Sequence, residues 1–189
     1  MSGTIVIING ASSAGKSSLI AEFQEIVAQP YLDVGLDKFI FSLPKKYLRE
    51  HWGDVLGEAD RSGPMGHHLV EGMHRSLAAL ASSGLNAIAD HVMVEPLRRD
   101  SLVAALQDSR VFIVGLHCPL AVLEAREIGR KDRTLGQAKK QHQLVHEGIV
   151  YDLEVDSSLK DAAGCAHEVA DLILSAEPSA LRAMRSNAN

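Results

Sequence analysis

The sequence predicts an α/β domain in which a five-stranded parallel sheet is covered by helices on both faces. Five short apolar runs rich in β-branched residues are spread along the 189 residues. A segment with apolar residues at helical spacing separates each run from the next. This alternation is typical of βαβ units, whose crossover helices pack on the two faces of a parallel sheet. The length suits a single domain with one sizeable core.

The expected strands follow the apolar runs in order: residues 4–9, 31–36, 86–92, 110–117 and 150–155. The run at residues 4–9, TIVIIN, ends at Gly10 and is typical of a buried central strand. The run at residues 110–117, RVFIVGLH, has the same character.

The expected helices lie between these strands: residues 16–27, 39–52, 67–83, 96–107, 119–129 and 160–174. The first ends at Gln29-Pro30, and the second has a break at Pro44. The stretch 53–66 is rich in Gly, Asp and Ser, which predicts a loop. We expect one domain at residues 1–178, with a lid at about 126–140 and a mobile tail without clear pattern at 179–189.

Composition excludes several classes of function. The net charge of −5 and the pI near 6.0 give no global basic field, so we expect no nucleic-acid partner. No apolar run approaches the ~20 residues that span a bilayer, and no basic segment precedes a signal-like stretch, so we expect no membrane partner. Two cysteines indicate reduced thiols in a cytoplasmic protein rather than a disulfide framework. Self-association as a homo-oligomer is left open.

The segment GASSAGKS matches G-x-x-x-x-G-K-[ST], the Walker A pattern, and lies between an expected strand and an expected helix. In this pattern the glycines let the backbone N–H groups curl around phosphate oxygens, the lysine adds charge at the β- and γ-phosphates, and the last hydroxyl binds Mg²⁺. The predicted nucleotide-binding residues are Gly10, Ala11, Ser12, Ser13, Ala14, Gly15, Lys16, Ser17 and Ser18. The alternative is a glycine-rich turn with an incidental lysine. The pattern predicts ATP with Mg²⁺, whereas the missing G-x-G-x-x-G argues against NAD or FAD.

Two aspartates follow neighbouring strands. Asp37 comes after the second expected strand and Asp90 near the end of the third. Ligands of open α/β sheets lie beyond the carboxyl ends of the strands, so both side chains are expected to face the phosphate loop. A carboxylate there can accept the proton of an attacking hydroxyl, for which we favour Asp37, or hold Mg²⁺, for which we name Asp90 with Ser17. The alternative for each is to cap the next helix.

Three arginines, Arg126, Arg130 and Arg133, would share one helical face if the helix from residue 119 continues. Arginine matches phosphate geometry and can stabilise charge on a transferring phosphoryl group. We expect Arg126 to bind nucleotide, and Arg130 and Arg133 to act in catalysis from a lid. The alternative is a solvated basic face paired with Glu124, Glu127 and Asp132.

Four segments together resemble chloramphenicol phosphotransferase, a family of small P-loop kinases similar in fold to shikimate and adenylylsulfate kinases. The segments are IINGASSAGKSSL, VGLDKFI, REIGRKDR and QLVHEGIVYDLEVDSS, and the likeness covers most of residues 4–175. The phosphate loop is generic, whereas VHEG-x-x-YD-x-EVD is far more particular.

The resemblance implies a P-loop kinase-like three-layer sandwich and transfer of the ATP phosphate to the primary hydroxyl of chloramphenicol, an inactivation that confers antibiotic resistance. It places the general base at Asp37, the phosphates at Gly15, Lys16 and Ser17, and the lid arginines at Arg130 and Arg133. The chain departs from the family where two adjacent aspartates are replaced by Asp90-His91, and residues 53–66 match poorly. The alternatives are a kinase of another small hydroxylated metabolite and a nucleotide-binding switch without an acceptor.

Overall fold

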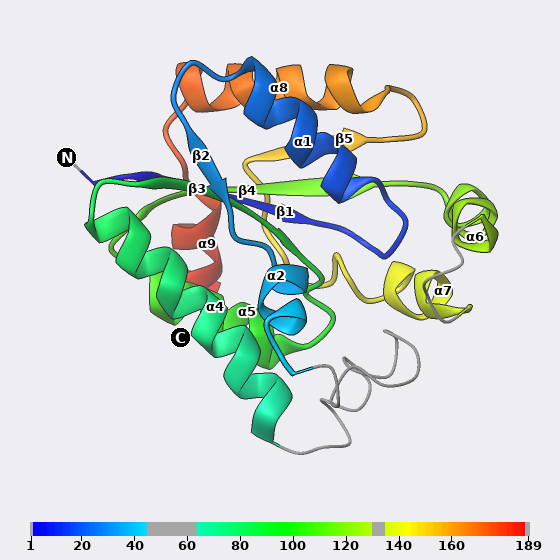
Figure 1. Ribbon diagram of the computed structural model, residues 1–189, viewed down its shortest axis with the longest axis horizontal. Helices are drawn as coiled ribbons and strands as arrows, with labels where there is room; N and C mark the ends of the chain where they lie inside the picture. The colour runs from blue at the N-terminus through cyan, green and yellow to red at the C-terminus, as the bar shows by residue number, and fades with distance from the viewer. Residues whose placement is uncertain (1, 45–63, 130–134, 188–189) are drawn as a thin grey trace.

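The computed structural model describes residues 2–44, 64–129 and 135–187. Its centre is a five-stranded sheet with the order β2-β3-β1-β4-β5, in which every neighbouring pair is parallel (Figure 1). The strands are Thr4–Asn9 (β1), Tyr31–Asp33 (β2), Asn86–His91 (β3), Arg110–His117 (β4) and Leu153–Asp156 (β5). The predicted fold class and the five-stranded parallel sheet are confirmed.

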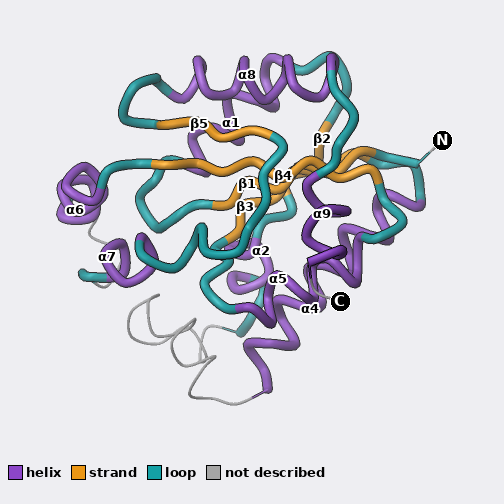
Figure 2. The backbone as a smooth tube through the Cα atoms, turned by 180° about the vertical axis from the view of Figure 1, so that it is seen from behind, coloured by secondary structure: helices purple, strands orange, loops and turns teal. Residues whose placement is uncertain are grey.

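Helices cover both faces of the sheet. Those of the described residues are Lys16–Ile26 (α1), Leu36–Phe41 (α2), Pro64–Ser82 (α4), Pro96–Leu106 (α5), Leu120–Ile128 (α6), Gln137–His142 (α7), Ala162–Ser175 (α8) and Ala180–Asn187 (α9). Helices α1 and α8 lie on one face, and α4, α5 and α9 on the other (Figures 1 and 2). Helices α6 and α7 lie beyond one end of the sheet, past β4 (Figures 1 and 2).

The central strand β1 shows why both faces must be covered. Its side chains alternate between two hydrophobic cores, with Val6 and Ile8 packing beneath α1 and α8, and Ile5 and Ile7 packing on the other side. All four have no exposed surface. Successive strand residues point to opposite faces, so a continuous apolar run needs an apolar layer on each side. The carboxyl end of this strand delivers the chain into the phosphate loop.

The segment after β2 differs in its boundaries from the prediction. Strand β2 ends at Asp33 rather than at residue 36, and α2 begins at Leu36 rather than at residue 39. Gly35 is the N-cap, in extended conformation, and the backbone N–H of Lys38 donates to its carbonyl. Asp37 therefore lies in the first turn of a helix. The predicted second helix beyond residue 44 and the loop up to residue 63 lie outside the described residues.

The end of the chain corrects the expectation of a mobile, patternless tail. Ala180–Asn187 form α9, and Ala180, Leu181 and Met184 are buried in the core on the α4–α5 side. Asp152 accepts hydrogen bonds from the backbone N–H groups of Ser179 and Ala180, which begin this helix. The spacing of the three buried residues is helical, but the segment is too short for that pattern to stand out in the sequence.

No helix within the described residues combines the length and apolar character that crossing a bilayer requires. Cys118 and Cys165 are both buried free thiols.

Candidate active site

The loop between β1 and α1 has the curled backbone that phosphate binding needs. Gly15 has φ +100° and caps α1, and Ser13 has φ +64°. Residues 12–18 line a cavity of about 520 Å³ at the N-terminus of α1. The hydroxyl of Ser13 is buried and has no hydrogen-bond partner among the described residues. A buried polar group without a partner is costly, and a phosphate oxygen in this cavity would supply one.

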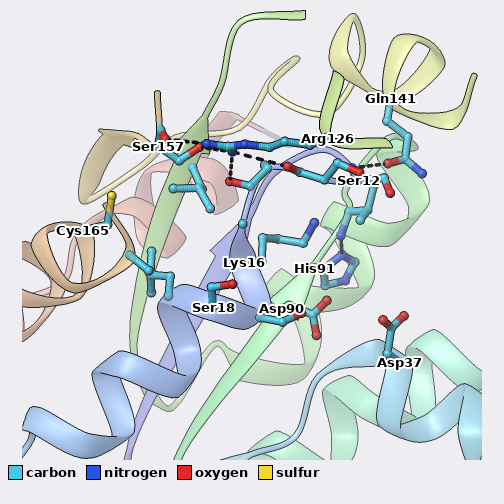
Figure 3. Close-up of a pocket in the computed structure, with 18 of the residues that line it drawn as sticks. Ser12, Lys16, Ser18, Asp37, Asp90, His91, Arg126, Gln141, Ser157 and Cys165 are labelled. Carbon is cyan, nitrogen blue, oxygen red and sulfur yellow. Dashed lines mark hydrogen bonds between the residues drawn. The ribbon is translucent and has the colours of Figure 1, made fainter. Parts of the chain in front are cut away.

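The side chain of Lys16 lines the same cavity (Figure 3). The side chain is only 8% exposed, and its Nζ donates to the carbonyls of Gly10 at 2.7 Å and Ala11 at 2.8 Å. Such partners are necessary because burial of a bare ammonium group is strongly unfavourable. The ammonium group is thus held at the phosphate loop, where phosphate oxygens can take the place of these carbonyls.

The two predicted carboxylates line this cavity as well. Asp37 reaches it from the first turn of α2, and Asp90 from the penultimate residue of β3 (Figure 3). Both side chains are half-buried. Neither residue caps the next helix, because the N-cap of α2 is Gly35 and that of α5 is Glu95. The helix-capping alternative therefore does not describe either aspartate.

Gly35 is the residue that makes room for the Asp90 carboxylate. A Cβ atom at Gly35 would lie 1.8 Å from Asp90 Oδ1 and 3.0 Å from its Cγ. Gly35 has φ −73°, which any residue can adopt, so the requirement for glycine comes from space rather than from backbone strain. The start of α2, which carries Asp37, and strand β3, which carries Asp90, therefore approach so closely at Gly35 that a larger side chain would not fit between them.

Arg126 extends from α6 across the outer side of the phosphate loop (Figure 3). Its guanidinium donates to the carbonyl of Ser157 at 2.9 Å, to the Ser157 hydroxyl at 3.1 Å, and to the carbonyl of Ala14 at 3.4 Å. It thereby joins the phosphate loop to the loop after β5. Lys160 and Asp161 of that loop, together with Cys165 of α8, form one end of the cavity. Arg130 and Arg133, the two predicted lid arginines, lie outside the described residues.

Glu127 holds the two helices at this end of the sheet together. The side chain is 3% exposed, and its two oxygens accept from the backbone N–H groups of Gly136 at 2.8 Å and Ala138 at 3.0 Å. These donors belong to the N-terminus of α7, where a carboxylate is favoured. Glu127 is therefore buried and fixes the start of α7 through two backbone N–H groups.

Helix α7 places a second side chain on the phosphate loop. The carboxamide oxygen of Gln141 accepts the backbone N–H of Ser12 at 2.7 Å (Figure 3). Gln141 directly follows the stretch at about 126–140 for which the sequence predicted a lid, and α7 itself was not predicted. A glutamine among lysines carries no signal of such a role, so sequence reasoning missed it.

His91, the last residue of β3, directly follows Asp90. The imidazole is fully buried, and the backbone N–H of Val92 donates to its Nδ1 at 2.8 Å. His91 therefore carries its proton on Nε2 and donates to His74 Nε2 at 2.8 Å, and His74 Nδ1 donates to Ser101 at 2.9 Å. Burial lowers the pKa of His74 to about 4 and that of His91 well below its usual value, with the nearby Arg98 adding to both shifts.

The segment VHEGIVYD anchors the strand that leads into the phosphate loop. Asn9, the last residue of β1, donates to the carbonyl of Val145 at 2.6 Å and to the Tyr151 hydroxyl at 2.7 Å. That hydroxyl lies 2.6 Å from His146 Nδ1 and donates to it. Burial raises the pKa of the Tyr151 hydroxyl. Burial and the nearby His117 lower the pKa of His146 to about 4, so both side chains are neutral at pH 7. This most particular part of the sequence is therefore structural support for the loop.

The chain resembles known proteins in sequence. The family described as chloramphenicol phosphotransferase-like protein matches residues 3–173. A Mycobacterium tuberculosis protein provisionally named as an O-phosphotransferase is 32% identical over 184 residues, which cover 88% of this chain and 80% of that protein.

Two solved structures show the same fold. An unliganded sugar kinase from Janibacter sp. superposes with a TM-score of 0.66 at 15% identity, covering 93% of this chain and 96% of that one. The adenylylsulfate (APS) kinase of Mycobacterium tuberculosis, in complex with AMPPNP and APS, gives a TM-score of 0.62 at 17% identity, covering 92% and 99%. The predicted P-loop kinase-like fold is thereby confirmed.

Proposed function

This chain belongs to the chloramphenicol phosphotransferase-like family, and on that premise we propose that it transfers the γ-phosphoryl group of ATP to a hydroxyl of a small molecule, chloramphenicol or a related antibiotic. The observation that carries the proposal is a single cavity in which a phosphate loop with its buried Lys16 faces two half-buried carboxylates, Asp37 and Asp90. The two reduced thiols suit a protein of the cytoplasm.

The cavity gives ATP an orientation. Its nucleoside end is at Arg126 and the loop after β5, and its acceptor end is at Asp37 (Figure 3). The triphosphate then runs along the N-terminus of α1, where the helix dipole and the loop N–H groups favour negative charge. The orphan hydroxyl of Ser13 and the ammonium group of Lys16 lie between the two ends and complete the phosphate site.

Magnesium fits the residues at the mouth of this loop. The ion prefers oxygen ligands and keeps several waters, so one hydroxyl and one carboxylate beside substrate phosphates are sufficient. Ser17 and Asp90 both line the cavity, and the carboxylate of Asp90 has its own space beside Gly35. These two residues would hold Mg²⁺, which supplies charge neutralisation at the phosphates when bound.

The reaction follows from these roles. The acceptor hydroxyl oxygen forms a bond to the γ-phosphorus while the bond from that phosphorus to the bridging oxygen of ADP breaks. Asp37 takes the proton of the hydroxyl, as a general base does. Lys16, with Arg130 and Arg133 from the segment outside the described residues, would stabilise the charge on the transferring group. The products are ADP and a phosphate ester.

The test is direct transfer. The protein is incubated with Mg-ATP and with chloramphenicol, related antibiotics and hydroxylated metabolites, and each mixture is examined by mass spectrometry for a gain of one phosphate. We expect the gain on one acceptor class. Phosphorylation of a metabolite alone would move the acceptor to another small molecule, and ATP turnover that no alcohol accelerates would favour a nucleotide switch.

Asp37→Asn separates the kinase from that switch. The substitution keeps the shape but removes the proton acceptor, so kcat should fall by roughly 10²–10⁴-fold while ATP binding changes little. Asp108→Asn, at an exposed position outside the cavity, is the matched control. Unchanged turnover in Asp37→Asn would contradict the assignment of the base, and lost binding of Mg-ATP would assign Asp37 to the metal.

A further inference from the structure

Gln141 accepts a hydrogen bond from one of the backbone N–H groups with which a phosphate loop binds phosphate. The backbone N–H of Ser12 donates to Gln141 Oε1 at 2.7 Å. A backbone N–H can only donate, so the group that meets it must be the carboxamide oxygen. A protein oxygen thus lies on the loop where a phosphate oxygen is otherwise bound, and a phosphate that needs this donor must displace Gln141.

The position along the loop identifies which phosphate competes. Ser12 and Gln141 lie on the side of Lys16 away from Ser157 and Cys165, which mark the proposed nucleoside end (Figure 3). The N–H groups nearest α1 face the inner phosphates of the proposed nucleotide, whereas Ser12 precedes them and lies toward the acceptor. The donor that Gln141 covers is therefore the one for the terminal phosphate.

The contact extends beyond one side chain, because α7 is fixed to α6. We refer to the described residues 120–129 and 135–142 as the α6–α7 arm. Glu127 of α6 accepts two backbone N–H groups at the start of α7, and Arg126 of the same helix donates to the carbonyl of Ala14. The arm thus binds the phosphate loop at two places, a carbonyl through Arg126 and an N–H through Gln141.

We propose that Gln141 makes the site distinguish a nucleoside triphosphate from a diphosphate. Its carboxamide and the terminal phosphate compete for the Ser12 N–H, so ATP releases this contact of the α6–α7 arm and ADP leaves it in place. After transfer of the phosphoryl group, the carboxamide returns to the loop. The inference rests on the proposed function, in which ATP binds at this loop.

Binding measurements test the competition without turnover. Dissociation constants for AMPPNP and for ADP, each with Mg²⁺, are measured by calorimetry for wild type, Gln141→Ala and Gln141→Glu. Gln141→Ala removes the competing acceptor and should tighten AMPPNP by about 2- to 10-fold, the value of one hydrogen bond, with ADP unchanged. Gln141→Glu should weaken AMPPNP, because a carboxylate holds the N–H more strongly and repels the phosphate. Gln143→Ala, an exposed glutamine two residues later, is the matched control.

Opposite signs for the two variants separate competition from a structural role, since a residue needed only for folding would weaken binding in both. If Gln141→Ala does not fold, Gln141→Met keeps the length of the side chain without the acceptor, and the same tightening is expected. Weaker or unchanged AMPPNP binding in the acceptor-free variant, or an equal change for ADP, overturns the inference. Failure of the wild type to bind either nucleotide overturns the proposed function itself.

Discussion

The close approach of Gly35 to Asp90 allows one methyl group to test the carboxylate that we propose as a magnesium ligand. In Gly35→Ala the new Cβ would lie 1.8 Å from Asp90 Oδ1, whereas ordinary contact begins at 3.4 Å. The carboxylate oxygen must therefore withdraw by about 1.6 Å, since the backbone of Asp90, 3.2 Å from the same Cβ, is held in β3 between β1 and β2. A displacement of about 1 Å in a catalytic group can cost roughly 10²-fold, and we expect a fall in kcat of that order.

The assay for Gly35→Ala is steady-state phosphoryl transfer over a range of Mg²⁺ concentrations, with the dissociation constant of ATP measured separately. Gly72→Ala is the matched control, because a Cβ there meets nothing within 4 Å. A double-mutant cycle with Asp90→Ala isolates the cause: once the carboxylate is gone, Gly35→Ala should have little further effect. Wild-type kcat in Gly35→Ala, or full additivity in the cycle, would refute the reasoning.

Two further substitutions test the charges on the transferring group. Lys16→Ala should lower turnover by about 10²-fold or more, because its buried ammonium group is held at the phosphate loop by the carbonyls of Gly10 and Ala11; near-normal ATP turnover in a folded variant would contradict the phosphate-loop assignment. Arg133→Ala, and to a lesser degree Arg130→Ala, should lower kcat more than it raises the KM for ATP, as interactions made mainly in the transition state do; a rise in KM alone would assign them to ground-state binding.

The sheet and the phosphate loop could be predicted because their signals are local. Strand β1 is a continuous apolar run that both faces of a parallel sheet require, and the glycine and lysine spacing after it fixes a backbone shape. The positions of Asp37 and Asp90 followed from topology, since strand ends of one sheet meet at one edge. None of these inferences needed a side-chain contact between distant segments.

The remaining parts of the site depend on contacts that the sequence does not show. Gln141 meets Ser12 across 129 positions, and Asn9 meets Val145 across 136. The sequence favours a surface role for Glu127, because it does not show that the backbone of α7 packs against this side chain. Gly35 looks like an ordinary loop glycine in the sequence, because the neighbouring Asp90 is distant along the chain. Gln141, Asn9 and Glu127 are polar and Gly35 is small, and hydrophobic periodicity carries no information about which distant groups such residues contact.

The buried pair His74 and His91 makes the stability of the fold depend on pH. His74 and His91 are neutral when folded, but an unfolded chain protonates histidine below about pH 6.5. The unfolded state therefore binds more protons as the pH falls from about 6.5 toward the pKa of His74, about 4, so stability is complete above this window and is lost within it. For His74 alone the loss between pH 7 and pH 5 is about 2 kcal/mol.

Urea unfolding at the two pH values measures this loss, and His74→Gln isolates its source. A glutamine oxygen can still accept the proton of His91 Nε2, but it does not titrate, so the variant should lose about 2 kcal/mol less than wild type between pH 7 and pH 5. His68→Gln, at an exposed position of the same helix, is the control and should lose as much as wild type. Equal losses in wild type and His74→Gln would mean that His74 is already protonated in the folded state at pH 5. His91 Nε2 would then have no acceptor at His74, and the chain of donors from Val92 to Ser101 could not run in the direction described.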